Sequence, residues 1–114
     1  MRGGYVAELV TNYVDTTDMC MELFFWSVAS VDSLYKPLVS IATVTESGKE
    51  FTQATSTGYE LETWNVLFAR LPAGIHRLIV RGARSNHGLC GISIDDIVVQ
   101  PCAKFGKTPR NFSR

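Results

Sequence analysis

The chain has 114 residues, enough for one domain with a single core, and 46% of them are hydrophobic. Its 11 basic and 11 acidic residues cancel, so the charge gives no reason to expect a nucleic acid or an anionic membrane as the main partner. No run approaches the roughly 18 apolar residues that span a bilayer. The opening MRGGYVAELV is too polar and too interrupted by glycine for a secretory signal peptide.

Strand-like patterns follow one another along the chain. Short runs of apolar, aromatic or β-branched residues occupy positions 5–10, 20–31, 38–44, 50–55, 61–71, 75–83 and 88–102. The segments ESGK at 46–49 and PAG at 72–74 have the composition of turns. Seven strand candidates without a convincing helix predict an all-β protein, an antiparallel sandwich or barrel.

The last twelve residues, AKFGKTPRNFSR, differ in composition from the rest of the chain. Four basic residues are spread among glycine, proline, asparagine and serine. This composition predicts a domain at residues 1–102 followed by a basic linker or tail at 103–114. Asn111 begins a glycosylation sequon, which has a consequence only in a secreted chain.

Three cysteines, Cys20, Cys90 and Cys102, restrict the chemistry that the chain can support. They form neither a CxxC pair nor a Cys/His cluster with zinc spacing, so a structural zinc site is not expected. In a small domain of short strands, cysteines suggest a disulfide and an oxidising compartment. The odd count leaves one thiol over.

Two neighbouring acids, Asp95 and Asp96, interrupt the apolar stretch GLCGISIDDIVVQPC at 88–102. Neighbours on a strand point to opposite faces, so the two carboxylates cannot converge on one substrate atom as an acid–base pair. The isoleucines before them are at even positions and the apolar residues after them, Ile97 and Val99, at odd ones. This change of parity predicts either a β-bulge or a strand that is buried on both sides.

Buried carboxylates need a partner, and two interpretations remain open. In the first, the acids cap the bend of the strand or pair with a nearby arginine, Arg77, Arg81 or Arg84. In the second, Asp95 and Asp96 contribute to a cation site.

The histidines and aromatic residues are further candidate sites. His87 and Cys90 are three residues apart, but no third orienting group is evident for nucleophilic catalysis, and His76 begins a strand. A stacking surface for sugars or a partner could be formed by Phe24, Trp26, Tyr59, Trp64 and Phe68. Aromatic residues in strands are more often core residues, and Tyr59 is the best exposed candidate among them.

Five segments in order resemble the MAM domain, the extracellular module named for meprin, the A5 antigen and receptor tyrosine phosphatase mu. They are GGYVAEL near the start, CMELFFW at 20–26, TGYELETWNVLFARLPAG at 57–74, HRLIVRGARSNHG at 76–88 and GISIDDIVVQPC at 91–102. The resemblance covers about residues 3–102, the C-terminal two thirds of such a domain. It implies a two-sheet jelly-roll β-sandwich that is incomplete at its N-terminus, with an exposed sheet edge and uncovered core surface.

The resemblance also assigns roles to single residues. Cys20 and Cys102 match the family's second disulfide, and Trp26 and Trp64 match positions that pack in the core. Cys90 lies outside the family pattern. It is then a free thiol, or it forms a disulfide with another chain or with a missing segment. A third alternative is that it pairs with Cys102.

The function implied by this family is a non-catalytic, extracellular protein-interaction or adhesion module of a larger secreted or membrane-anchored protein. Its partners would be extracellular proteins, including a second copy of the same module. The alternative is a carbohydrate-binding jelly-roll module. Some relatives bind a cation near the last strand, so calcium at Asp95 and Asp96 is expected only in a complete domain, because calcium takes six to eight oxygen ligands.

Overall fold

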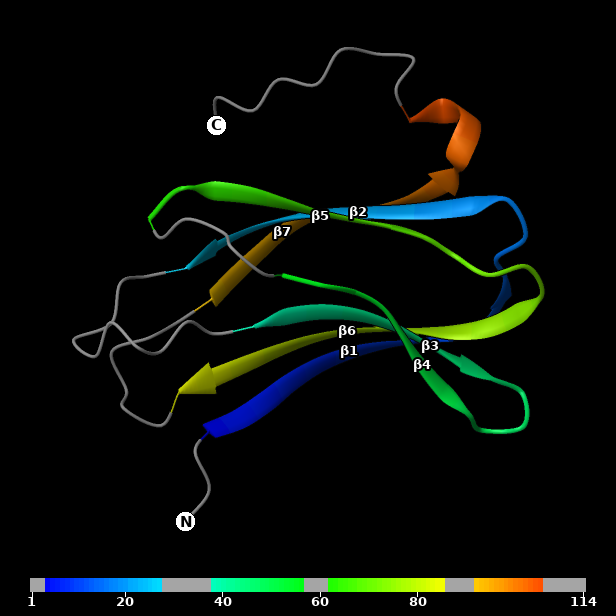
Figure 1. The fold of residues 1–114 in the computed structure, drawn as a ribbon, viewed down its shortest axis with the longest axis horizontal. Helices are drawn as coiled ribbons and strands as arrows, with labels where there is room; N and C mark the ends of the chain where they lie inside the picture. The colour runs from blue at the N-terminus through cyan, green and yellow to red at the C-terminus, as the bar shows by residue number, and fades with distance from the viewer. Residues whose placement is uncertain (1–3, 28–37, 57–61, 86–91, 106–114) are drawn as a thin grey trace.

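A computed structural model of the chain describes residues 4–27, 38–56, 62–85 and 92–105, which form two antiparallel sheets facing each other (Figure 1). The strands are β1 (Gly4–Asp15), β2 (Met19–Ser27), β3 (Val39–Thr45), β4 (Glu50–Thr55), β5 (Trp64–Arg70), β6 (Ile75–Ser85) and β7 (Ile92–Pro101). A short 3-10 helix, η1 (Cys102–Lys104), follows β7. The all-β, two-sheet prediction is confirmed.

The sheets contain strands that are distant in the sequence. One sheet has four strands in the order β1-β6-β3-β4, and the other has three in the order β5-β2-β7. Of the described strands, β3 and β4 are the pair that is both consecutive and hydrogen-bonded. Their turn is the predicted one at 46–49, where the Gly48 N–H donates to the Thr45 carbonyl (2.8 Å) and Gly48 has φ +92°.

The core lies between the two sheets and follows the period of two along each strand. From β2, the odd-numbered Met21, Leu23 and Phe25 are buried in it. The other buried members of this cluster are Val39, Ile41, Leu67, Ala69, Leu71, Leu78 and Val80, with Met19, Ala54 and Ile94 packed against them. β3, β5 and β6 thus contribute alternate residues, β4 and β7 contribute one partly buried residue each, and residues 8–15 of β1 contribute none.

β1 extends to Asp15, five residues beyond the C-terminal end that the sequence pattern predicted. Its pairing with β6 shifts between Val10 and Tyr13, so Thr11 and Asn12 together face one residue of β6. The Leu78 N–H donates to the Thr11 Oγ1 (2.9 Å) at this bulge. A bulge reverses the alternation of side chains, which explains why the polar Thr-Asn pair was not recognised as strand.

Candidate interaction surface

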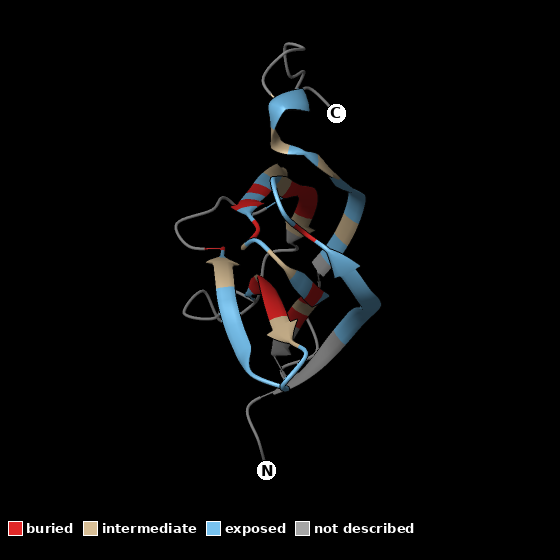
Figure 2. Ribbon diagram, turned by 90° about the vertical axis from the view of Figure 1, so that its right-hand side faces the viewer, coloured by how far each residue is buried: buried red, intermediate tan, exposed pale blue. Residues whose placement is uncertain are grey.

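The first strand is exposed over residues 8–15, the part of it whose side chains are described. Every residue from 8 to 15 is exposed, and Figure 2 shows this part of the strand in pale blue at one side of the molecule. β1 pairs with β6 on one side only, because it is the edge strand of its sheet. An edge strand that is exposed on both faces has room for a further partner.

The exposure of β1 follows from the unequal width of the two sheets. A side chain on Gly82 of β6 would meet the Ile94 Cδ1 of β7 at 3.9 Å, so β7 covers β6. β7 is the last strand of its sheet, and β1 therefore extends one strand beyond the sheet that should cover it. The sandwich has an uncovered step along this side.

Apolar side chains that face inward line this step. Leu9 pairs with the core residue Val80 and shares its face, yet 60% of Leu9 is exposed. Val14, which pairs with the buried His76, is 40% exposed. Across the step, Val99 of β7 pairs with the core residue Met21 and is 38% exposed. We call Leu9, Val14 and Val99 the open side.

The open side is where the described structure has the exposed edge and uncovered core surface that the sequence led us to expect. Inward-facing leucine and valine side chains are normally removed from water in a sandwich. Their exposure here has a geometric cause, since nothing in the described chain lies across β1. A surface of this kind favours contact with another polypeptide.

The two acids of β7 lie at a bulge. Phe24 of β2 pairs with Asp95, and Glu22 pairs with Val98, so β7 has one residue more than β2 between these pairs. Asp96 has φ +55°, and its backbone N–H donates to the Asp95 Oδ1 (2.8 Å). The prediction of a β-bulge is confirmed, and Asp95 caps the bend.

The arginines named as partners for these acids lie elsewhere. Arg81 pairs with residues of β1 and β3 on the outer face of the four-stranded sheet, whereas Asp95 lies on the outer face of the opposite sheet. The Arg77 guanidinium lies 4.9 Å from the ring centroid of Tyr13. The side chain of Arg84 lies outside the described part. Among the described residues, no group of three or more histidine, cysteine or acidic side chains could hold a metal ion.

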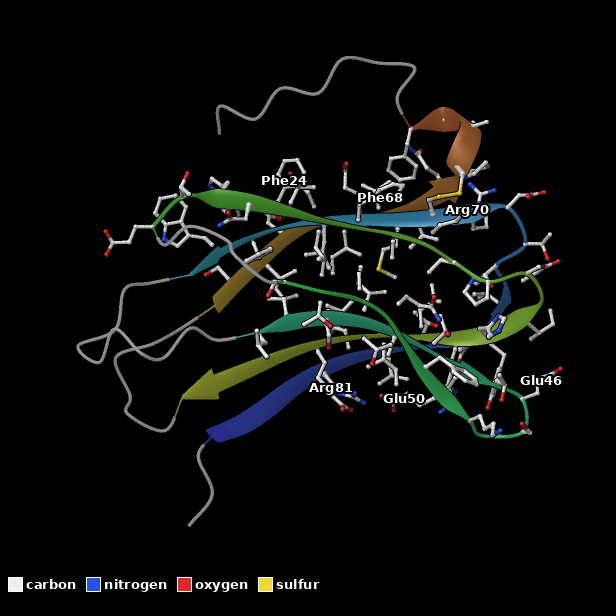
Figure 3. The ribbon with its side chains drawn as sticks, viewed as in Figure 1. Phe24, Glu46, Glu50, Phe68, Arg70 and Arg81 are labelled. Atoms are coloured by element: carbon white, nitrogen blue, oxygen red, sulfur yellow. A yellow bond between two sulfur atoms is a disulfide. The ribbon has the colours of Figure 1, made fainter. Side chains whose placement is uncertain are left out.

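A charged cluster crosses the outer face of the four-stranded sheet. The Arg81 guanidinium contacts Glu8 of β1 (Nε to Oε2, 2.6 Å) and Glu50 of β4 (Nη1 to Oε2, 2.7 Å). Figure 3 shows Arg81 and Glu50 pointing away from the core. Hydrogen bonds from Arg81 lower the pKa of Glu50, and those to Glu50 and Glu8 raise the pKa of Arg81. Through Arg81 of β6, the cluster connects β1 with β4, the two edge strands of this sheet.

A disulfide joins Cys20 to Cys102 at one end of the sandwich, with Cα atoms 4.9 Å apart and a sequence separation of 82. It connects the start of β2 to the residue after β7. The Cys102 N–H also donates to the Asp18 carbonyl (2.9 Å). A shallow hollow of about 460 Å³ lies beside it, lined by Asp18, Arg70, Pro101, Cys102 and Ala103. The disulfide holds β7 against β2.

The aromatic residues of β2 and β5 gather on the outer face of the three-stranded sheet. Trp26 and Trp64 pair across the two strands, with ring centroids 5.7 Å apart at an interplanar angle of 68°. Both are half-buried. The expectation that they pack in the core was wrong, because Trp26 alternates with the inward-facing Phe25 and Trp64 pairs with Trp26 on the same outer face.

Two phenylalanines share that outer face (Figure 3). Phe24 is buried in the middle strand, whereas Phe68 on β5 is 47% exposed and stacks edge-on with Phe105 at a centroid distance of 5.4 Å. The burial of Phe24 on an outer face shows that flanking side chains cover this ring. The face is amphipathic, with exposed apolar rings at the β5 edge.

Several residues considered in the sequence analysis lie outside the described part of the chain, namely Tyr59, His87, Cys90 and Asn111. Of the two histidines, His76 is described, and it is buried with its Nδ1 2.9 Å from the Thr16 Oγ1. Within the described ranges, no helix is long and apolar enough to cross a membrane.

Comparisons of the chain with protein-family models, with curated proteins and with solved structures find no match. The resemblance to MAM domains therefore rests on the sequence motifs alone. The open side, which the sequence indicated only as some missing cover, is located by the sheet pairing and by the exposure of inward-facing residues.

Proposed function

We propose that this chain is a non-catalytic extracellular protein-interaction module, a MAM-like jelly roll that binds its partner along the open side. The observation that carries this proposal is the exposure of Leu9, an inward-facing leucine at the edge of a sandwich. A contact there would remove apolar surface from water, which is the main driving force of protein association.

The disulfide supports the extracellular part of the proposal. The bond between Cys20 and Cys102 is of a kind that persists in oxidising compartments and is rare in the cytosol. The position of the two acids supports a non-catalytic role, since Asp95 caps a bulge rather than facing a second acid across a pocket. The strand order, which alternates between two sheets, is compatible with a jelly roll.

The test is binding of the fluorescently labelled, disulfide-intact chain to the surface of cells. We expect saturable binding that is lost when the cells are treated with protease and unchanged by an excess of free saccharides. Leu9→Lys should weaken the binding, because it places a charge among apolar groups, whereas Val10→Lys alters the opposite face of the same strand. Binding that both variants retain equally would contradict the open side as the contact.

A carbohydrate-binding function is the second candidate, and one observation favours it. Trp26, Trp64 and Phe68 lie on one outer sheet face, where exposed rings could stack on sugars. In the same experiment this function would show as binding that survives protease, falls with saccharide competition and is reduced by Phe68→Ala.

A further inference from the structure

The hollow at the disulfide end of the sandwich is lined by two opposite charges. Asp18 and Arg70 both lie along it, and Pro101, Cys102 and Ala103 form the rest of its wall. Figure 3 shows Arg70 at the same end of the sandwich as the yellow disulfide bond. Both charged side chains are exposed, and no ion pair joins either of them to the other or to another described residue. Each charge is therefore accessible to a ligand.

The backbone that carries the two charges is held in place by covalent and hydrogen-bonded contacts. Arg70 of β5 pairs with Cys20 of β2, and Cys20 is bonded to Cys102. The Cys102 N–H donates to the Asp18 carbonyl (2.9 Å), so one connected series of contacts runs from Arg70 to Asp18. Groups that are positioned before binding lose less conformational entropy when a ligand arrives, which favours a binding site at this place.

The chemistry of the two side chains indicates which ligand would use both. The planar guanidinium of arginine binds a carboxylate through two parallel hydrogen bonds, and an ionised aspartate accepts hydrogen bonds from an ammonium group. A free amino acid carries both groups on one carbon atom. The volume of the hollow, about 460 Å³, lies within the range of about 300–1,000 Å³ that is typical of small-molecule sites.

We propose that this hollow binds a free α-amino acid as its zwitterion, with the carboxylate on Arg70 and the ammonium group on Asp18. Pro101 and Ala103 would contact an aliphatic side chain of the ligand. A ligand with only one of the two charges would be repelled by the residue of like charge. Because both charges are exposed to water, we expect weak binding, with a dissociation constant of ~1 mM. The inference is independent of the proposed function, since no residue of the open side lines the hollow.

The test titrates the isotope-labelled, disulfide-intact chain with L-leucine and follows the backbone amide signals of Asp18, Arg70 and Cys102 by two-dimensional NMR. Two matched ligands are used in parallel: N-acetyl-L-leucine lacks the ammonium group, and L-leucine amide lacks the carboxylate. We expect saturable shifts with L-leucine and binding at least about fivefold weaker with either matched ligand. Equal binding of all three ligands, or no shift at about 20 mM L-leucine, would overturn the proposal.

Variants of the two charged residues test the site from the side of the protein. Asp18→Asn removes the charge and keeps the backbone, because Asp18 has φ +58° and asparagine tolerates this region. Asp18→Asn and Arg70→Gln should each weaken L-leucine binding about fivefold or more. Lys104→Gln is the matched control, since Lys104 is exposed on η1 and does not line the hollow, and it should change binding by less than about twofold.

The signals of each variant also report whether it is folded. A folded Asp18→Asn or Arg70→Gln variant that binds L-leucine as well as the natural chain would overturn the proposal. If a variant does not fold, the comparison of the three ligands on the natural chain still decides. Leu9→Lys, which alters the open side, should bind L-leucine unchanged, so the amino-acid site and the proposed function stand or fall separately.

Discussion

The Nδ1 atom of His76 lies 2.9 Å from the Oγ1 atom of Thr16, and both side chains are buried. The same hydroxyl is 2.5 Å from the Pro72 carbonyl and 3.1 Å from the Gly74 carbonyl, which can only accept. Because the hydroxyl proton goes to one of these carbonyls, His76 carries a proton on Nδ1 and donates it to Thr16. This contact joins the β1–β2 turn to the start of β6, and the carbonyls of Pro72 and Gly74 join it to the β5–β6 turn.

Replacing Thr16 by valine should therefore destabilise the fold. Thr16→Val keeps the shape but leaves the His76 Nδ1–H without its acceptor in a buried site. We expect a loss of about 2–3 kcal/mol in the free energy of unfolding, measured by urea denaturation. Thr16→Ser retains the hydroxyl and should lose about 1 kcal/mol or less. Equal losses in the two variants would show that packing, and not the hydrogen bond, is what matters.

The disulfide between Cys20 and Cys102 should contribute a large part of the stability. Closing a loop of this length removes conformational entropy from the unfolded chain, an effect of ~4–5 kcal/mol on the chain-entropy model. We expect a reductant to lower the midpoint of thermal unfolding of the natural chain. The double variant Cys20→Ala/Cys102→Ala should begin at the lower value and show no response to the reductant.

Peptide mapping without reduction checks the pairing independently. The proteolytic fragments that contain Cys20 and Cys102 should be recovered as one linked species. A dominant link between Cys90 and Cys102 would contradict the pairing seen in the structure.

Asp96 should tolerate glycine better than a β-branched residue. Its φ of +55° is in the left-handed region, where a side chain is costly and glycine is not. Asp96→Gly should leave the free energy of unfolding within about 1 kcal/mol of the natural value, whereas Asp96→Val should lower it by more, in chemical denaturation. If valine were as well tolerated as glycine, the bulge would not have the backbone conformation described.

Acid should weaken the charged cluster on the four-stranded sheet. The pKa of Glu50 is lowered in the folded state by its hydrogen bond with Arg81, so its stabilising effect is fully present above its ordinary value of 4.5 and is lost as the pH falls through the lower folded value. We expect Glu50→Gln to reduce the dependence of stability on pH below about 4.5.

The matched control for this measurement is Glu46→Gln in the exposed turn. Glu46 lies in the β3–β4 turn, away from Arg81 (Figure 3). Its replacement should leave the loss of stability at acidic pH as it is in the natural chain. If both variants reduced the pH dependence of stability equally, the effect would be general to acidic side chains.

The sequence predicted local features well where a signal lies within a few residues. The turn at 46–49 was predicted from its Ser-Gly composition, and the bulge at Asp96 from the change of parity in the apolar residues. Both are properties of adjacent residues, which the order of side chains expresses directly. The extension of β1 to Asp15 was missed, because its bulge hides the alternation.

The side of the sheet on which Trp26 and Trp64 lie could not be predicted in the same way. Aromatic residues on strands usually face the core, but both faces of β2 are apolar, and the pattern does not say which face is inside. Phe25 packs in the core, so its neighbour Trp26 faces outward, and Trp64, which pairs with Trp26, does the same.

The sequence by itself determined that this chain forms strands and turns, because side chains on a strand alternate and turns need particular residues. Only the tertiary structure decided the order of the strands, since the pairings of β1 with β6 and of β2 with β7 join residues 60 or more positions apart. That order leaves Leu9 uncovered beyond β7. The open side therefore follows from which strand lies opposite which, a relation that no local pattern contains.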